Sequence, residues 1–128
     1  MRHDLLSDAL VTIKNADRVG KPDARVPASR LVGEILRLLQ EKGYITGFER
    51  QENGRGGEFK VQLNGRINSC GAIRPRFSVK VREMDRHEER YLPAKDFGIP
   101  ILTTPQGIIN NDQAKAGHTG GRLLAYAY

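Results

Sequence analysis

The stretch PASRLVGEILRLLQEKGYITGFERQ, residues 27–51, carries two hydrophobic periods in succession. In its first half, apolar residues recur three and four positions apart, which is the spacing of one face of an α-helix. Pro27 suits the first turn of this helix, and Gly43 suits the position just after its last turn. The second half, Tyr44–Gln51, instead predicts a strand. A helix that leads directly into strands indicates an α+β fold.

The preceding and following residues extend this pattern. Asp4 is expected to cap an earlier helix, which ends at the breaker Gly20-Lys21-Pro22. A short extended piece, Arg25-Val26, links the two helices. Further on, alternate residues from Phe59 to Leu63 are apolar, which is the period of a half-buried strand. Together these segments predict a helix-strand-helix-sheet domain. The apolar stripe of the first helix consists of Leu6, Ala9, Leu10 and Ile13.

The segment Arg74–Arg82 is a further candidate strand with two unlike faces. Because side chains alternate along a strand, one face would carry four cations and a serine while the other is apolar. Four cations without an acid favour a strip that faces phosphates. The alternative is a solvated sheet edge guarded by charge, to which Pro75 is also suited. The outward set is Arg74, Arg76, Ser78, Lys80 and Arg82.

A run poor in apolar residues, Glu83–Arg90, follows this strand and is expected to connect two domains. We therefore expect an N-terminal α/β domain over residues 1–82, a connector over 83–90 and a smaller, strand-rich domain over 91–128. The elements expected in the C-terminal domain are strands at Ile99–Leu102, Ile108-Ile109 and Arg122–Tyr128, and a short helix capped by Asn111 or Asp112 that ends at Gly117.

Charge gives the first indication of a partner. The 128 residues include 21 Lys and Arg against 15 Asp and Glu, a formal net charge of +6. Residues 1–82 carry 16 basic and 9 acidic side chains, and residues 83–128 carry 5 and 6. A basic excess favours a polyanionic partner, most commonly a nucleic acid, with an anionic membrane surface as the main alternative.

Several classes of protein are disfavoured by what the sequence lacks. No apolar run approaches the roughly 18 residues of a membrane span, and Met1–Leu6 does not resemble a secretory signal. One cysteine, Cys70, and three scattered histidines offer neither a disulfide nor a metal-ligand cluster. Cys70 has no neighbouring His to activate it, and phosphate-loop and nucleophile-elbow motifs are absent. We therefore expect a cytoplasmic protein without a cofactor or metal, and not an enzyme.

Two stretches have the chemistry to contact RNA. Thr103-Thr104-Pro105-Gln106-Gly107 offers two hydroxyls, an amide and a glycine in one short loop. Such groups hydrogen-bond base edges, sugar hydroxyls and phosphates at close backbone approach. In His118–Arg122, paired glycines would allow a similar approach, with Arg122 next to them. The alternative for either stretch is an ordinary polar turn.

These stretches also belong to an ordered set of motifs. The set includes Leu63-Asn64-Gly65-Arg66-Ile67-Asn68, Leu102-Thr103-Thr104, Gly107-Ile108 and His118-Thr119-Gly120-Gly121. Further members are Asp4–Ala16, Gly43-Tyr44-Ile45 with Phe48-Glu49, Cys70-Gly71, Pro75-Arg76-Phe77, Leu92-Pro93 and Phe97-Gly98. Over nearly its whole length the chain closely resembles the S-eight family of small-subunit ribosomal proteins (universal ribosomal protein eight), in its archaeal and eukaryotic form.

The resemblance implies a two-domain α/β protein that is a structural part of the small ribosomal subunit. It implies direct binding to the central domain of 16S-type rRNA, a role in subunit assembly, neighbouring small-subunit ribosomal proteins as partners, and a cytoplasmic place in the ribosome. The family's Ser/Thr-rich contact loop corresponds to Thr103, Thr104, Gln106 and Gly107. Pro105 departs from the family's usual Ser and offers neither a hydroxyl nor an amide donor.

The uneven charge suggests that the first domain supplies phosphate affinity while the second reads RNA shape. The alternative functions are an extraribosomal translational repressor that binds its own messenger RNA, and a basic enzyme that acts on a phosphorylated substrate. The expected RNA-binding residues are Lys14, Asn15, Arg74, Arg76, Thr103, Thr104, Gln106, Gly107, Gly120, Gly121 and Arg122.

Overall fold

A computed structural model describes residues 5–73, 78–83, 90–92, 98–105 and 107–128. The chain divides into two compact units, Met1–Cys70 and Gly71–Tyr128. This boundary precedes the one expected after residue 82. Most of the expected connector, residues 84–89, lies outside the described residues, as does Asp4, the expected cap of the first helix.

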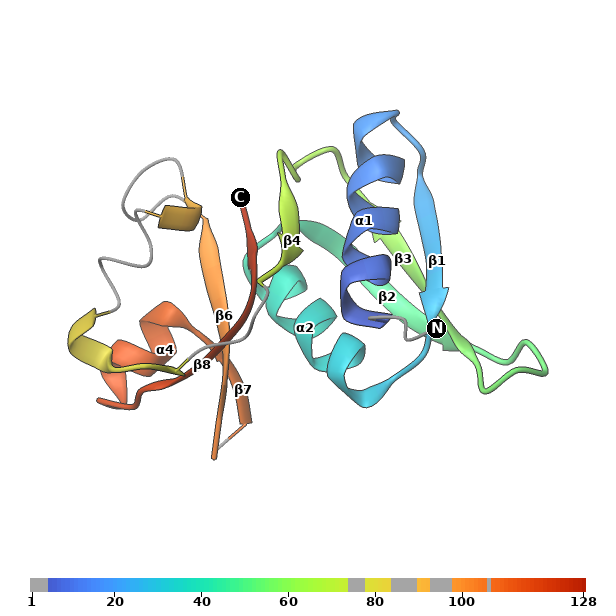
Figure 1. Cartoon of the computed structure of the whole chain (residues 1–128). Helices are drawn as coiled ribbons and strands as arrows, with labels where there is room; N and C mark the ends of the chain where they lie inside the picture. The colour runs from blue at the N-terminus through green and yellow to red at the C-terminus, as the bar shows by residue number, and fades with distance from the viewer. Residues whose placement is uncertain (1–4, 74–77, 84–89, 93–97, 106) are drawn as a thin grey trace. The chain divides into compact units, whose positions relative to one another are not determined.

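In the N-terminal unit, two helices cover one face of a three-stranded antiparallel sheet (Figure 1). Its elements are α1 (Leu5–Arg18), β1 (Asp23–Pro27), α2 (Arg30–Glu41), β2 (Ile45–Gln51) and β3 (Glu58–Leu63). The central strand is β3, which pairs with β1 on one side and with β2 on the other. The expected helix-strand-helix-sheet order is confirmed. Buried apolar residues come from both helices and all three strands, among them Leu10, Ile13, Val26, Ile35, Leu39, Ile45 and Val61.

The second helix begins later than Pro27 suggested. Pro27 is the last residue of β1, and the N-cap is Ser29. The backbone N–H of Val32 donates to Ser29 Oγ at 3.1 Å, which satisfies one of the free donors in the first helical turn. The end of the helix is as predicted, because Gly43 follows the last turn with a φ of 81°.

The C-terminal unit is an antiparallel sheet that packs against α4. Its elements are β4 (Cys70–Ala72), β5 (Ser78–Val79), the 3-10 helix η1 (Val81–Glu83), β6 (Ile99–Thr104), β7 (Gly107–Asn110), α4 (Asn111–Ala116) and β8 (Gly121–Ala127). The strand order is β4-β8-β6-β7, and β5 also pairs with β8. The strands expected near residues 99, 108 and 122 are confirmed.

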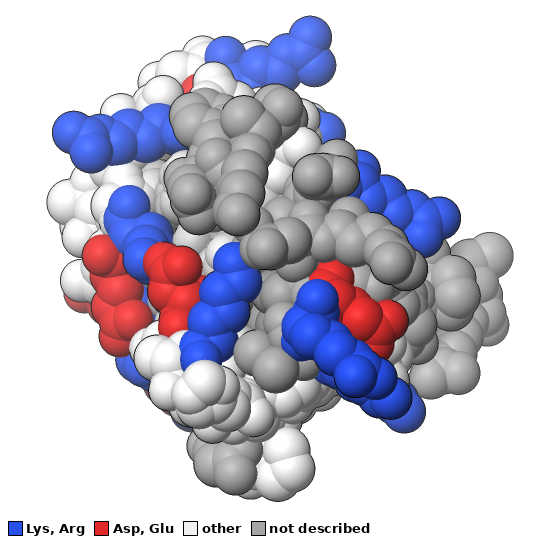
Figure 2. All heavy atoms as spheres, turned by 90° about the vertical axis from the view of Figure 1, so that its left-hand side faces the viewer, with Lys and Arg blue, Asp and Glu red and all other residues white. Residues whose placement is uncertain are grey.

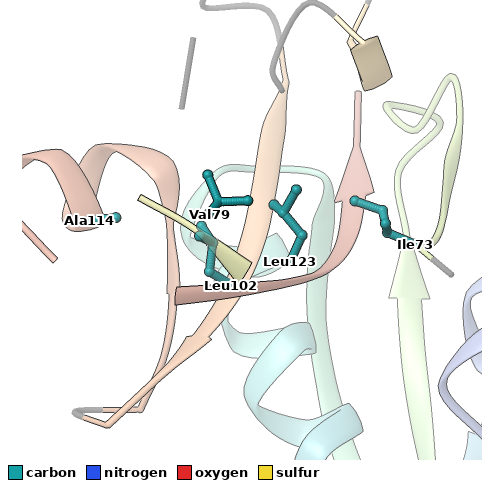
Figure 3. Packing of buried hydrophobic residues seen from close by; sticks show 5 residues of the cluster. All are labelled: Ile73, Val79, Leu102, Ala114 and Leu123. Atoms are coloured by element: carbon teal, nitrogen blue, oxygen red, sulfur yellow. The ribbon is translucent and has the colours of Figure 1, made fainter. Parts of the chain in front are cut away.

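A small core forms where β5, β6 and β8 meet α4. Figure 3 shows Val79, Leu102 and Leu123 facing one another, with Ala114 on one side and Ile73 on the other. Because Ile73 and Val79 belong to this core, the chain enters the second unit well before residue 82. Packing, rather than the composition of the segment after residue 82, therefore determines the boundary.

The segment 74–82 is not one continuous strand, which corrects the expectation. Residues 74–77 lie outside the described residues, so Arg74 and Arg76 have no structural account. Strand β5 covers only Ser78 and Val79, and the 3-10 turn η1 follows. Glu83 closes this turn, since its backbone N–H donates to the Lys80 carbonyl at 2.9 Å. The turn breaks the alternation that would have placed Lys80 and Arg82 on one face with Ser78.

The cap of α4 is Asn110, not Asn111 or Asp112 as expected. Asn110 Oδ1 accepts a hydrogen bond from the backbone N–H of Gln113 at 2.9 Å. In return, Gln113 Oε1 accepts one from the backbone N–H of Asn110 at 3.0 Å. This reciprocal capping box explains why the helix starts where it does. The predicted end at Gly117 is confirmed.

With the observed boundary, the charge asymmetry between the two parts of the chain disappears. Residues 1–70 carry 12 basic and 9 acidic side chains, and residues 71–128 carry 9 and 6, so each unit has a net charge of +3. The four cations between Arg74 and Arg82 belong to the second unit. Net charge therefore gives no reason to assign phosphate affinity to the first unit alone.

Candidate nucleic-acid interface

Thr103 and Thr104 lie at the end of a strand, not in a loop. Strand β6 runs through Thr104, and β7 begins at Gly107, which is opposite Thr104. Pro105 is exposed in the turn that joins them, and Gln106 lies outside the described residues. The predicted contact loop is therefore the tip of a tight β-hairpin.

The two threonines face opposite sides of the sheet. Thr104 Oγ1 donates to the carbonyl oxygen of Gly107 at 2.8 Å, so this hydroxyl proton is used within the hairpin. Thr103 lies directly opposite Arg122 of β8. Opposed residues of antiparallel strands share a face and successive residues alternate, so Thr103 shares its face with Arg122 and Thr104 does not. From the sequence, both hydroxyls had been expected to contact RNA in the same way.

A row of polar side chains crosses this sheet. Ser78 of β5 is opposite Arg122 of β8, and Arg122 is opposite Thr103 of β6. We name these three residues the polar row. Their side chains share one face in the order hydroxyl, guanidinium, hydroxyl. Ser78 and Arg122 are exposed and Thr103 is half-buried, so the row offers donors and acceptors suited to phosphate and sugar oxygens.

An open hollow of about 590 Å³ lies next to the polar row. This volume is in the range of ligand pockets, roughly 300–1,000 Å³. Lys80 and Arg122 contribute positive charge, against the carboxylate of Glu83, which accepts a hydrogen bond from the Lys80 backbone N–H at 3.3 Å. The charged side chains around the hollow thus have a positive balance. Its lining residues are Ser78, Val79, Lys80, Glu83, His118, Gly120, Gly121 and Arg122.

Gly120 and Gly121 are required by the neighbouring strands. A Cβ on Gly120 would lie 2.6 Å from the carbonyl oxygen of Val79, and one on Gly121 would lie 2.5 Å from that of Thr103. No side chain fits at such distances. The sequence predicted close approach to a ligand, whereas the structure shows close approach to the backbones of β5 and β6. Because β8 packs so closely between β5 and β6 at these glycines, Arg122 lies between Ser78 and Thr103.

His118 is a lining residue of the hollow that belongs to the predicted stretch His118–Arg122 but was not among the expected RNA-binding residues. It has a φ of 50°, which is uncommon for a residue with a side chain. The His118 N–H donates to the Lys115 carbonyl at 3.2 Å, and the next N–H, of Thr119, donates to Ala114 at 2.9 Å. This is the C-terminal helix motif that usually selects glycine at its left-handed position. Its side chain is exposed at the edge of the hollow, and the available signal in the sequence was a His directly after the helix-ending Gly117.

The other expected residues are distributed as follows. Lys14 and Asn15 lie on α1 of the N-terminal unit, half-buried and exposed respectively, and so form no part of the polar row. Gly120, Gly121 and Arg122 line the hollow. Ser78 and Lys80 belonged to the predicted outward face of the 74–82 segment, but their approach to residues 118–122 could not be predicted, because it depends on the pairing of β5 with β8.

Cys70 is a core residue rather than a reactive one. It is buried, and its Sγ–H donates to the carbonyl of Leu10 at 3.4 Å. Burial raises the pKa of this thiol to about 12, against a smaller lowering effect of Lys14. The thiol is therefore protonated at neutral pH, as expected for a structural cysteine.

Two kinds of feature are absent from the described part of the chain. Among those residues, no three His, Cys, Asp or Glu side chains are grouped as metal ligands. No helix formed by them has the length and apolar character needed to cross a membrane.

Figure 2 views the molecule from the side on which α4 and β7 are labelled in Figure 1. On this face, the blue Lys and Arg side chains are spread out, and red Asp and Glu side chains lie between several of them. The described residues visible here thus form no single continuous basic patch.

Comparison with known proteins gives the family. The family model of ribosomal protein S8 matches residues 4–128. A protein of Archaeoglobus fulgidus, named small ribosomal subunit protein uS8, is 51% identical over 129 residues, which cover 100% of both chains. The protein of that name from Picrophilus torridus is 51% identical with the same coverage. That of Methanococcoides burtonii is 50% identical over 126 residues, 98% of this chain and 97% of its own.

The fold and these matches define a small α+β ribosomal protein. The chain belongs to the ribosomal protein S8 family. The resemblance inferred from the ordered motifs is therefore confirmed, including its archaeal type, since these relatives are archaeal proteins.

Proposed function

We propose that this chain is a structural constituent of the small ribosomal subunit that binds the central domain of 16S-type rRNA directly and supports subunit assembly. Its relatives are named small-subunit proteins, and membership of their family supports the same role here, in cytoplasmic ribosomes beside other small-subunit proteins. The function is binding, not catalysis. An extraribosomal repressor is not proposed, because no described feature favours messenger RNA over ribosomal RNA.

The polar row and its adjacent hollow carry this proposal. The guanidinium of Arg122 has a planar fork that matches a phosphate, and the hydroxyls of Ser78 and Thr103 lie on either side of it. Contacts to phosphate and to the 2′-hydroxyl let a protein recognise the shape of an irregular RNA helix. The hollow beside the row has a volume suited to an unstacked nucleotide, with Lys80 and His118 in its wall.

A matched pair of substitutions tests this proposal. Thr103→Val removes a hydroxyl from the polar row, whereas Thr104→Val removes one from the opposite face. We expect Thr103→Val to weaken binding to a central-domain rRNA fragment by about 5- to 150-fold, since an unpaired polar group costs about 1–3 kcal/mol. Thr104→Val should lower the free energy of unfolding by about 0.5–1.5 kcal/mol with nearly unchanged RNA affinity.

Both properties are measured on the same purified variants, by RNA titration and by urea denaturation. Unaltered affinity in a folded Thr103→Val variant would remove the polar row from the interface. Equal affinity losses in the two variants would also contradict the proposal, because RNA binding would then depend on the whole hairpin tip.

A further inference from the structure

Cations from three separate segments lie at one end of the N-terminal unit. The first segment is the C-terminal half of α1 with the residues after it, the second is the end of α2, and the third lies between β3 and β4. Figure 1 shows this third segment beside the C-terminal end of α1. We name the five residues the helix-end cluster: Lys14, Arg18, Lys21, Lys42 and Arg66.

Hydrogen bonds hold these segments together. The Asp17 carboxylate accepts from the backbone N–H groups of Gly65 at 2.9 Å and Ile67 at 3.0 Å. Arg66 is therefore fixed beside the last turn of α1. Its guanidinium extends to the end of α2, where Nη1 lies 3.6 Å from the place that a Cβ on Gly43 would occupy. The cluster is thus a product of the tertiary structure and is not visible as a run of charge in the sequence.

The Asp17 carboxylate is directed to backbone groups and not to the side chains of the cluster. Asp17 is only 6% exposed, and both of its oxygens accept hydrogen bonds from backbone N–H groups. Arg18, Lys21 and Arg66 are exposed. Within the described ranges, no ion pair joins any of these three, or Lys14, to a carboxylate. The positive charge is therefore open to a ligand from solution.

Four other cations of the same unit are arranged differently, because each lies within 4.0 Å of a carboxylate. The ion pairs are Arg25–Glu58 at 2.8 Å, Arg37–Glu41 at 3.1 Å, Arg50–Glu52 at 3.7 Å and Lys60–Asp23 at 4.0 Å. Surface charges that only maintain solubility are mixed in sign, and these paired side chains follow that pattern. The cluster differs in that four of its members, Lys14, Arg18, Lys21 and Arg66, form no ion pair with a described residue. Interaction with helix dipoles accounts for cations at the ends of α1 and α2, but not for Arg66, which comes from a loop.

We propose that the helix-end cluster binds the phosphodiester backbone of a structured RNA, as a second contact surface distinct from the polar row. The inference rests on the proposed function only in that its ligand is also RNA. Phosphates carry no sequence information, so the cluster contributes affinity to any structured RNA and makes that affinity dependent on salt.

Two triple variants of the full chain test the cluster. Arg18→Gln with Lys21→Gln and Arg66→Gln neutralises three cluster cations, and Arg25→Gln with Arg37→Gln and Lys60→Gln neutralises three paired ones. Each changes the formal net charge from +6 to +3. Binding to a central-domain rRNA fragment and to an unrelated RNA duplex is measured over a range of salt concentrations. For both RNAs, the slope of log affinity against log salt should be shallower in the cluster variant by about 0.7–0.9 for each phosphate that the protein no longer neutralises, and nearly unchanged in the control.

A charge-preserving variant, Arg18→Lys with Arg66→Lys, should keep the wild-type slope and separates loss of charge from local unfolding. The proposal is overturned by equal slopes in the two triple variants. It is also overturned if the cluster variant keeps its RNA affinity but enters small subunits poorly, which would assign the cluster to an acidic protein neighbour. Failure of the proposed function is a separate result, namely equal wild-type affinity for the central-domain fragment and the unrelated duplex.

Discussion

Thr103 and Thr104 are adjacent and chemically alike, yet only Thr103 shares a face with Arg122. The sequence identifies both as hydroxyl donors, but the face that each occupies depends on the register of β6 against β7 and β8. The pair Gly120-Gly121 is similar. Its flexibility could be predicted from residue type, whereas the carbonyl groups that exclude a side chain belong to strands distant in sequence. At this scale the sequence predicted the residue types of the site but not their partners.

Cys70 provides a test of the core through pH. Burial raises the pKa of its thiol from 9.0 to about 12. Between these values the native state keeps the proton and the unfolded state releases it, so the free energy of unfolding should decline as pH rises above about 9. Between pH 8 and pH 10 the contribution of this thiol should fall by about 1.4 kcal/mol, the equivalent of one pKa unit. Urea denaturation of wild type and of Cys70→Ala at both pH values isolates the contribution of the thiol to the free energy of unfolding. If that free energy changes equally with pH in the two proteins, the thiol is accessible to solvent in the native state.

Elements with a persistent apolar pattern could be predicted, whereas exact helix starts and the 3-10 turn after β5 could not. The helices α1 and α2 and the strands β2, β3, β6 and β8 were predicted because their apolar repeats persist over several residues. Two helix starts were placed incorrectly, at Pro27 for α2 and at Asn111 or Asp112 for α4. Ser29 and Asn110 are the caps because their side chains reach a backbone N–H, which residue type alone does not reveal. The strand expected over 74–82 was wrong because Glu83 closes a 3-10 turn there.

Asp17 should be the main link between α1 and the segment after β3. In Asp17→Asn the side chain loses its charge and one of its two acceptors, so a buried backbone N–H is left without its partner. The free energy of unfolding should fall by about 1.5–3 kcal/mol, the range for hydrogen bonds to charged groups. Asp8→Asn, an exposed carboxylate of the same helix, is the control and should change stability by about 0.5 kcal/mol or less. Urea denaturation at neutral pH measures both, and equal effects would show that Asp17 has no special structural role.

The expected domain boundary differs from the observed one because a composition shift carries no information on strand pairing. Ser78 and Val79 pair with Arg122 and Gly121, so residues before and after the 83–90 run belong to one sheet. The family could be recognised because it depends on ordered motifs, which need no three-dimensional contact, and the match over residues 4–128 confirms it. The helix-end cluster could not be predicted, since its members are joined only through the contacts of Asp17 and Gly43.

Direct binding to the central domain of small-subunit rRNA is the central claim, and chemical footprinting of protein-free rRNA with this chain alone tests it. The account predicts protection confined to the central domain, at protein concentrations that leave the rest of the rRNA unprotected. Thr103→Val should weaken that protection, while Thr104→Val should leave it in place, because only Thr103 lies in the polar row. Protection that appears only in another rRNA domain, or only after other ribosomal proteins have been added, would contradict the account.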